Sequence, residues 1–172
     1  MTELLGQIFG LIGVGFTLLT YQMNSNKKIL LVLGCGTICF CLNYLLLGAY
    51  PGFVLNALAL LRNLAYYHRD KKPFSSRFVP IIFAVLMALG GLLSWQGWYS
   101  ILVIVALVLN TLAVGAGRPN LLRKSILITS PMVLIYNCIV LSIGGILNES
   151  VAILSSIVGL LRYRSQTDSK NN

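Results

Sequence analysis

The chain has 172 residues and a formal net charge of +9, yet only 10% of its residues are charged and 57% are hydrophobic. Soluble domains carry about 25% charged residues, so this composition, with a mean hydropathy of +0.84, excludes a soluble globular protein. The basic residues lie in short segments between apolar runs and form no basic face on which a nucleic acid could dock. The sequence therefore predicts an all-α, polytopic membrane protein.

Turn residues and charges divide the chain into seven apolar segments. Crossing a bilayer core about 30 Å thick takes roughly 20 apolar helical residues. The uncharged runs 30–61 and 78–117 are each long enough for two spans and a turn. Pro51 suits the first turn of the third helix, where its missing N–H costs nothing. The predicted transmembrane helices are 4–23, 29–48, 51–68, 78–96, 98–117, 124–143 and 146–163.

The distribution of Lys and Arg predicts the orientation. In a seven-span topology all 13 of them fall on one side of the membrane, whereas the other side carries Glu3 and Glu149 but no Lys or Arg. Cytoplasmic loops carry the excess of basic residues. We therefore expect a multi-pass protein of the inner (cytoplasmic) membrane, with the N-terminus outside and the C-terminus in the cytoplasm.

Comparison of the chain with itself indicates a repeat with a period near 100. Leu60-Leu61-Arg62 recurs as Leu160-Leu161-Arg162, and Leu42-Asn43-Tyr44 resembles Ile135-Tyr136-Asn137. These matches predict two parallel three-helix units joined by an inversion helix (3+1+3), with a solute path between the halves. Chance similarity between Leu-rich helices is the alternative. The predicted parts are the first repeat 1–72, the linker helix 73–97, the second repeat 98–164 and a disordered cytoplasmic tail 165–172.

Three segments carry a resemblance to a known family: 44–51 (YLLLGAYP), 142–149 (SIGGILNE) and Leu161-Arg162. With them, the whole chain resembles the bacterial inner membrane protein YgjV family, whose molecular function is not established. The architecture also resembles the SWEET and SemiSWEET sugar transporters of the PQ-loop group. That second resemblance implies three-helix units paired around a central pocket, through which sugars move without an energy source.

The SWEET resemblance also implies particular site residues. Asn56 matches the pocket asparagine of the third helix, Ser156 holds the corresponding position in the second half, and Phe40 is the nearest match to a pocket aromatic residue. The first helix of that family ends in Pro-Gln, where the proline helps gating. Here the same place reads Thr20-Tyr21-Gln22, so the glutamine is present and the proline is not.

Amide side chains in mid-span are the other candidates for solute contact. A polar group in lipid is costly, so these amides should face the interior of the bundle. An amide has two donors and an acceptor, which suits hydroxyl-rich neutral solutes. Bonds to neighbouring helices are the structural alternative. The candidates are Asn43, Asn56, Asn110 and Asn137.

Charged residues near the helix ends leave two interpretations open. Arg62 and Arg162 either snorkel to inner headgroups or form an inner gate with Gln22. Glu149 is placed at the outer end of the last helix, where a carboxylate in the first turn favours the helix dipole. No Asp or Glu then lies inside a predicted span, and proton-coupled carriers usually bury such a group. The pattern therefore favours a facilitative carrier.

Catalytic and metal-binding motifs are not found in the sequence. It shows no Ser/His/Asp set and no phosphate loop, and its four cysteines lie in apolar runs with a single histidine, His68, elsewhere. We expect neither an enzyme nor a cofactor. Two functions stay open: a facilitative carrier of a small neutral polar solute by alternating access, or a non-transporting accessory or lipid-interacting protein. The expected partners are the lipid bilayer and the solute; a homodimer is compatible with the sequence but not required.

Overall fold

The computed structural model describes residues 1–172 except 21–25, 69–75, 77, 117 and 172, and leaves a few further side chains, including those of 162–171, undescribed. Within the described residues the chain forms seven helices and no strand. The helices are α1 (Thr2–Thr20), α2 (Asn26–Leu46), α3 (Tyr50–Tyr67), α4 (Val79–Leu93), α5 (Ser100–Gly115), α6 (Pro119–Ile139) and α7 (Ile143–Asn171).

The seven predicted helices are confirmed, although most of their ends differ from the prediction by a few residues. Helix α6 begins at Pro119, five residues earlier than predicted, because proline is well suited to the first turn of a helix. Pro51 opens α3 in the predicted way. Helix α7 extends to Asn171, and the disordered tail 165–172 stays a prediction. Residues 165–171 contain no Gly or Pro that would end the helix.

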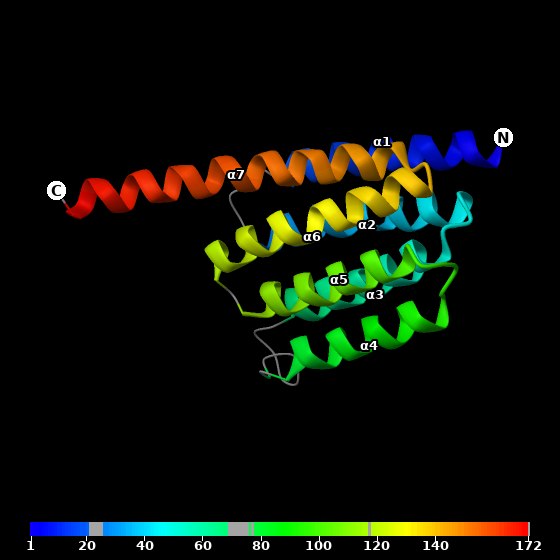
Figure 1. Cartoon of the computed structure of the whole chain (residues 1–172), viewed down its shortest axis with the longest axis horizontal. Helices are drawn as coiled ribbons and strands as arrows, with labels where there is room; N and C mark the ends of the chain where they lie inside the picture. Colours follow the sequence, from blue (N-terminus) through cyan, green and yellow to red (C-terminus); the bar gives the residue numbers. More distant parts are fainter. Residues whose placement is uncertain (21–25, 69–75, 77, 117, 172) are drawn as a thin grey trace.

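Six of the helices lie in two facing layers, and Figure 1 shows this arrangement. The first layer holds α1, α2 and α3 in sequence order, and the second holds α7, α6 and α5. Helix α1 packs against α7 and α3 against α5, while no Cα atoms of the middle helices α2 and α6 approach within 8 Å in the described residues. Helix α4 packs against α3 and α5 at one edge. Side chains of α2 and α6 therefore fill the space between the layers.

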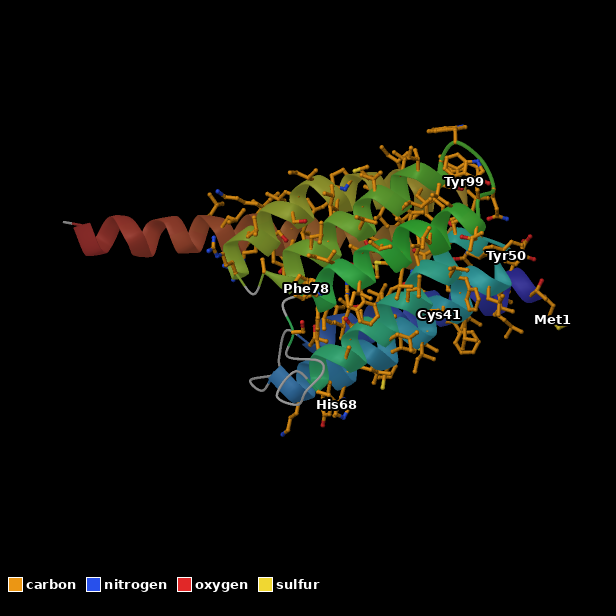
Figure 2. The ribbon with its side chains drawn as sticks, turned by 90° about the horizontal axis from the view of Figure 1, so that it is seen from below. Met1, Cys41, Tyr50, His68, Phe78 and Tyr99 are labelled. Carbon is orange, nitrogen blue, oxygen red and sulfur yellow. The ribbon has the colours of Figure 1, made fainter. Side chains whose placement is uncertain are left out.

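The bundle has two distinct ends, which Figure 2 labels. Met1, Tyr50 and Tyr99 lie at one end, called here the Met1 end, and His68 and Phe78 lie at the other, called the His68 end. The turns α2–α3 and α6–α7 both lie at the Met1 end, because each follows a helix that runs toward it.

Small residues allow α1 to approach its neighbours closely. A Cβ at Gly144 of α7 would collide with the backbone of Gly10, so these two helices touch at backbone distance. Gly6 lies against α2, with Leu46 Cβ 3.2 Å from where its own Cβ would stand. Gly6 and Gly10 thus serve close packing, as small residues do in membrane helices.

The two turns at the Met1 end share one backbone geometry. Gly48 has φ +70° and Leu141 has φ +55°. The residue after each donates its N–H to a carbonyl five residues back: Ala49 N to Tyr44 O at 2.9 Å, and Ser142 N to Asn137 O at 2.9 Å. Every one of these positions recurs after 93 residues, not about 100. In this register the counterpart of Asn56 is Glu149; the predicted pairing of Asn56 with Ser156 does not match the turns.

The outer surface of the bundle is apolar. Two helical stretches, Thr2–Thr20 and Ile143–Leu161, are by length and composition able to cross a membrane, and Leu31–Leu46, Val79–Leu93 and Ser100–Gly115 are shorter apolar helices. Leucine and isoleucine side chains are exposed along every helix. A helix satisfies its own backbone groups, as the hydrocarbon core requires. This surface is suited to lipid.

Candidate functional site

A cluster of polar and aromatic side chains joins the two layers near the Met1 end. The Tyr44 hydroxyl of α2 donates to Asn137 Oδ1 of α6 at 2.8 Å, and the N–H of Gly52 in α3 donates to the Tyr136 hydroxyl of α6 at 2.9 Å. The Tyr44 and Tyr136 rings lie 6.2 Å apart between centroids. We call Asn43, Tyr44, Tyr136, Asn137 and Ser142 the polar bridge.

Asn43 ties this bridge to two more elements. Its Nδ2 donates to the carbonyl of Gly6 in α1 at 2.8 Å, and its Oδ1 accepts from the Ser142 hydroxyl at 2.7 Å. Asn43, Tyr136, Asn137 and Ser142 are fully buried and Tyr44 nearly so. Because buried polar groups are costly unless they are bonded, these five residues fix how α1, α2, α6 and the α6–α7 turn meet.

Two buried amide atoms near the bridge have no hydrogen-bond partner within the part of the chain that the structure describes. They are Nδ2 of Asn137 and Oδ1 of Asn148. The Asn137 amide is held between two neighbours: the Tyr44 hydroxyl donates to its Oδ1, and Gly145 packs directly on it, so that a Cβ at Gly145 would lie 2.5 Å from Asn137 Cγ. Native structures rarely leave such a donor unsatisfied. The amino group of Asn137 is thus a buried donor without a hydrogen-bond partner among the described residues.

Two glutamines, which we call the glutamine latches, close the Met1 end. Gln7 of α1 donates through Nε2 to the Leu141 carbonyl at 2.6 Å, and its Oε1 accepts from the Ile143 N–H at 3.0 Å. Gln96, before α5, donates to the Gly48 carbonyl at 2.9 Å and accepts from the Tyr50 N–H at 3.0 Å. Each latch thus reaches from one layer to the turn of the other. The two turns are clamped in the same way.

A hollow of 390 Å³ lies between these latches at the Met1 end. We call it the vestibule. Its walls come from both latched turns, and Tyr99, whose ring lies 6.0 Å from that of Tyr136, connects it to the polar bridge. The lining residues are Glu3, Gln7, Leu47, Gly48, Ala49, Gln96, Tyr99, Ile139, Val140 and Leu141.

Comparison with known proteins identifies the family of this chain. Residues 4–167 match the Imp-YgjV family, described as bacterial inner membrane protein. The chain belongs to this family. No curated protein and no solved structure matches it. The predicted YgjV resemblance and the inner membrane location are thereby confirmed, while the likeness to SWEET transporters stays a prediction.

This Imp-YgjV member brings together two of the predicted site residues, Asn43 and Asn137, in the polar bridge. Asn56 is partly buried, and its Nδ2 donates to the Gly52 carbonyl one turn earlier in the same helix at 2.9 Å. Phe40 is buried against Gly13 of α1. Two further predicted residues lie elsewhere: Ser156 is buried on α7 and Asn110 is partly buried on α5.

Of the three predicted gate residues of the Imp-YgjV chain, the structure describes the side chain of Arg62 alone. Gln22 and the side chain of Arg162 lie outside the described residues. Arg62 does not reach toward headgroups, because its side chain is only 7% exposed. Its Nη1 donates to Thr111 Oγ1 of α5 at 2.8 Å, and its Nε and Nη2 donate to Asn63 Oδ1 at 3.3 and 3.1 Å. Arg62 therefore links α3 to α5 inside the bundle, toward the His68 end.

Glu149 of the Imp-YgjV chain lies deeper than its sequence position suggests. Helix α7 begins at Ile143, so the carboxylate lies in the second turn, and the first turn holds no acidic residue. The expected first-turn cap is therefore wrong. Glu149 also falls within the stretch Ile143–Leu161, which could cross a membrane. Because the stretch Ile143–Leu161 contains Glu149, the expectation that no carboxylate lies inside a span does not hold for this helix.

Sequence reasoning missed several residues of this site. Gln7 is a lone amide in an apolar run, and Gln96 lies beside a predicted turn. Both positions are noticeable in the sequence, but neither indicates which atoms the glutamine bonds to. Pro131 lies inside α6 next to the buried Ser130. Because proline has no N–H, it removes one backbone hydrogen bond from α6. The helix thus has a weakened point one turn from the polar bridge.

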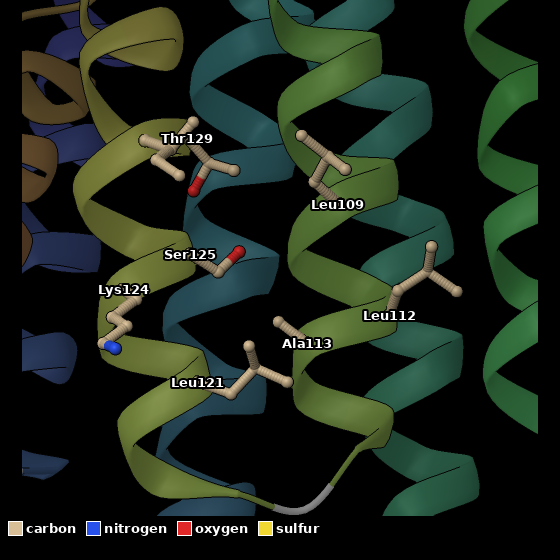
Figure 3. Close-up of a pocket in the computed structure, with 8 residues that line it drawn as sticks. Leu109, Leu112, Ala113, Leu121, Lys124, Ser125 and Thr129 are labelled. Carbon is tan, nitrogen blue, oxygen red and sulfur yellow. The ribbon is translucent and has the colours of Figure 1, made fainter.

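Figure 3 shows a second hollow, on the lateral surface between α5 and α6. Its volume is 330 Å³. The lining is mostly apolar, and Ile128 and Leu121 are exposed at the surface, so the groove opens sideways and not toward the polar bridge. The lining residues are Leu109, Leu112, Ala113, Leu121, Lys124, Ser125, Ile128 and Thr129.

Proposed function

We propose that this Imp-YgjV protein is a carrier that moves a small neutral polar solute across the inner membrane by alternating access. The observation that carries the proposal is the amino group of Asn137, which is buried between the two layers without a partner among the described residues, in an amide that accepts from the Tyr44 hydroxyl. Amide and phenol groups match the hydroxyls of sugar-like solutes. A protein built only for stability would fill this position with apolar side chains.

The arrangement of hydrogen bonds supports alternating access. Bonds between the layers gather at the Met1 end, where the polar bridge and both glutamine latches lie. Toward the His68 end, Arg62 and Thr111 supply a further link. In this proposal the structure is the form closed at the Met1 end. Rocking of the layers breaks the latches and opens the vestibule to Asn137.

The proposed repeat is a 3+1+3 arrangement with the parts 1–72, 73–97 and 98–164. The shared turn geometry at a spacing of 93 residues supports it, as does the reciprocal packing of α1 on α7 and α3 on α5. We further propose seven spans, with the Met1 end outside and the His68 end in the cytoplasm, because Lys and Arg are confined to the latter side. The protein acts without catalysis, and one chain supplies the whole path.

Counterflow in proteoliposomes tests this function. Folded, reconstituted protein is loaded with an unlabelled solute and challenged with the same solute labelled, using glucose, sorbitol, serine and uridine in turn. The proposal expects saturable exchange of at least one of them. No exchange of any panel member by folded protein would reject the carrier.

Two variants separate the amino group of Asn137 from the bridge itself. Tyr44→Phe removes the hydrogen bond between the layers but keeps the amino group, whereas Asn137→Leu removes both. The loss of one solute hydrogen bond worth about 1.4 kcal/mol weakens binding about tenfold. We expect KM in Asn137→Leu to exceed that in Tyr44→Phe by this factor. Equal values in the two variants would mean that the amino group does not contact solute.

The lateral groove favours a second candidate, a lipid-interacting protein. Its walls are apolar, and Lys124 provides a cation near the His68 end, where an acyl chain and an anionic headgroup would be accommodated. The lipid that co-purifies with the protein tests this candidate. Lys124→Gln should lower the amount of anionic lipid retained after detergent extraction, whereas Lys28→Gln, at an exposed lysine of α2, should not. Equal lipid content would favour the carrier alone.

A further inference from the structure

The vestibule at the Met1 end receives equivalent walls from the two halves of the chain. Three pairs of its lining residues are spaced by 93 residues, the spacing that relates the two turns: Glu3 and Gln96, Leu47 and Val140, and Gly48 and Leu141. Its volume of 390 Å³ lies within the range of about 300–1,000 Å³ that is typical of small-molecule sites. The hollow is therefore large enough for a small ligand.

One of these pairs differs in charge. Glu3 is a carboxylate, whereas Gln96 at the equivalent position is a neutral amide that bonds to the α2–α3 turn. Glu3 is the one charged side chain in the described lining, and it makes no ion pair within the residues that the structure describes. The sequence places no Lys or Arg in the segments that form the Met1 end. The negative charge of the vestibule is therefore not compensated by a basic side chain.

The start of α1 explains a carboxylate at Glu3 but not the groups that share its hollow. A negative charge in the first turn of a helix is favoured by the helix dipole. The same hollow also contains Tyr99, and an aromatic ring attracts a cation that lies over its face. The carbonyls of Gly48 and Leu141 each accept one hydrogen bond from a glutamine latch and keep a second lone pair. The vestibule therefore suits a ligand that is positively charged and donates hydrogen bonds.

We propose that the vestibule binds a small hydroxylated primary amine, whose ammonium group pairs with Glu3 and whose hydroxyls bond to the Gly48 and Leu141 carbonyls. Bound between the two glutamine latches, this ligand stabilises the closed form and blocks the carrier. It is not the carried solute, because the polar bridge consists of neutral side chains, and a cation moved there from Glu3 would lose its counter-charge. The blocking role rests on the proposed transport function, whereas the binding itself does not.

Two compounds that differ in one group test the site. Glucamine is sorbitol with a terminal hydroxyl replaced by an amine, which is protonated at neutral pH as a lysine side chain is. In calorimetric titrations of the protein in an uncharged detergent, glucamine should bind about fivefold more tightly than sorbitol, the factor expected of one ion pair at an exposed carboxylate. Glu3→Gln, which makes this position like Gln96, should remove the preference. Glu3→Asp and the control Asp168→Asn, near the end of α7, should keep it.

Counterflow supplies the second measurement. Glucamine should inhibit exchange of the transported panel solute, and about fivefold more of it should be needed in Glu3→Gln. Equal affinities of the natural protein for glucamine and sorbitol, or a preference retained in Glu3→Gln, overturn the amine site. Exchange of labelled glucamine itself overturns the blocking role. Absence of counterflow with every panel solute rejects the carrier and with it the blocking role, while the comparison of affinities still decides the amine site.

Discussion

The glutamine latches should hold the Met1 end closed, and replacing them by methionine should open it. Methionine has nearly the shape of glutamine but cannot bond to the turns. Gln7 and Gln96 each make two hydrogen bonds to backbone atoms of the opposite layer. These bonds are exposed, so each contributes about 0.5 kcal/mol, the lower end of the usual range. Each latch then stabilises the closed form by about 1 kcal/mol, or about fivefold.

Ala49 offers a probe of this opening. It lines the vestibule but is only 2% exposed, so a cysteine there should react with a membrane-impermeant maleimide only when the latches release. In a background without the four natural cysteines, labelling of Ala49→Cys should accelerate about fivefold with either Gln→Met change. The two latches lie on different turns, so their effects should add, giving about 30-fold together.

The control for this experiment is Gln166→Met, which makes the same chemical change far along α7. Its labelling rate should equal that of the parent. The reasoning is refuted if either latch variant labels within twofold of the parent, or if the double variant reacts no faster than the single ones.

Three further outcomes are expected from SDS titrations of unfolding. Gly144→Ala should destabilise the protein by about 2 kcal/mol, because the added Cβ meets the Gly10 backbone. Gly15→Ala has open space around it and should stabilise the protein by about 0.5 kcal/mol. Equal effects of the two substitutions would contradict the close α1–α7 contact. Leu141→Gly should stabilise by about 0.5 kcal/mol, since leucine is strained at φ +55°; a loss would show that the Leu141 side chain matters more than its backbone. 

The helices and part of the polar bridge could be predicted from the sequence. Apolar runs between charges locate helices well, because hydrocarbon admits only segments that satisfy their own backbone. Leu42-Asn43-Tyr44 and Ile135-Tyr136-Asn137, compared as a repeat, turn out to meet through Tyr44 and Asn137, a contact that their likeness did not predict. The predicted period near 100 came from the two Leu-Leu-Arg segments, which can recur by chance in Leu-rich helices. The turns at Gly48 and Leu141 are instead spaced by 93 residues.

The latches and the depth of Glu149 could not be predicted in the same way. A sequence shows that Gln7 is polar, but its partners are backbone atoms of Leu141 and Ile143, and every residue has such atoms. A shift of three residues in the start of α7 is within the usual error of helix boundaries. That shift moves Glu149 from the first turn to the second, and so away from a capping position.

The free-energy contribution of the buried Arg62 can be estimated from its hydrogen bonds and from the cost of burying its charge. Its three hydrogen bonds to Thr111 and Asn63 contribute about 1 kcal/mol each. Placing an arginine within the hydrocarbon core costs about 3 kcal/mol. The two terms nearly cancel, so Arg62 adds little net stability, and Arg62→Met should change the free energy of unfolding by less than about 1 kcal/mol.

Arg62 therefore offers a test of the proposed movement of the layers. If the link from Arg62 to Thr111 is remade in each cycle, Arg62→Met should abolish net transport while the protein stays folded, and Thr111→Val should lower it less, because Asn63 still holds the guanidinium. A loss of several kcal/mol in Arg62→Met, with transport falling only as folded protein falls, would instead make Arg62 a structural anchor of α3 on α5.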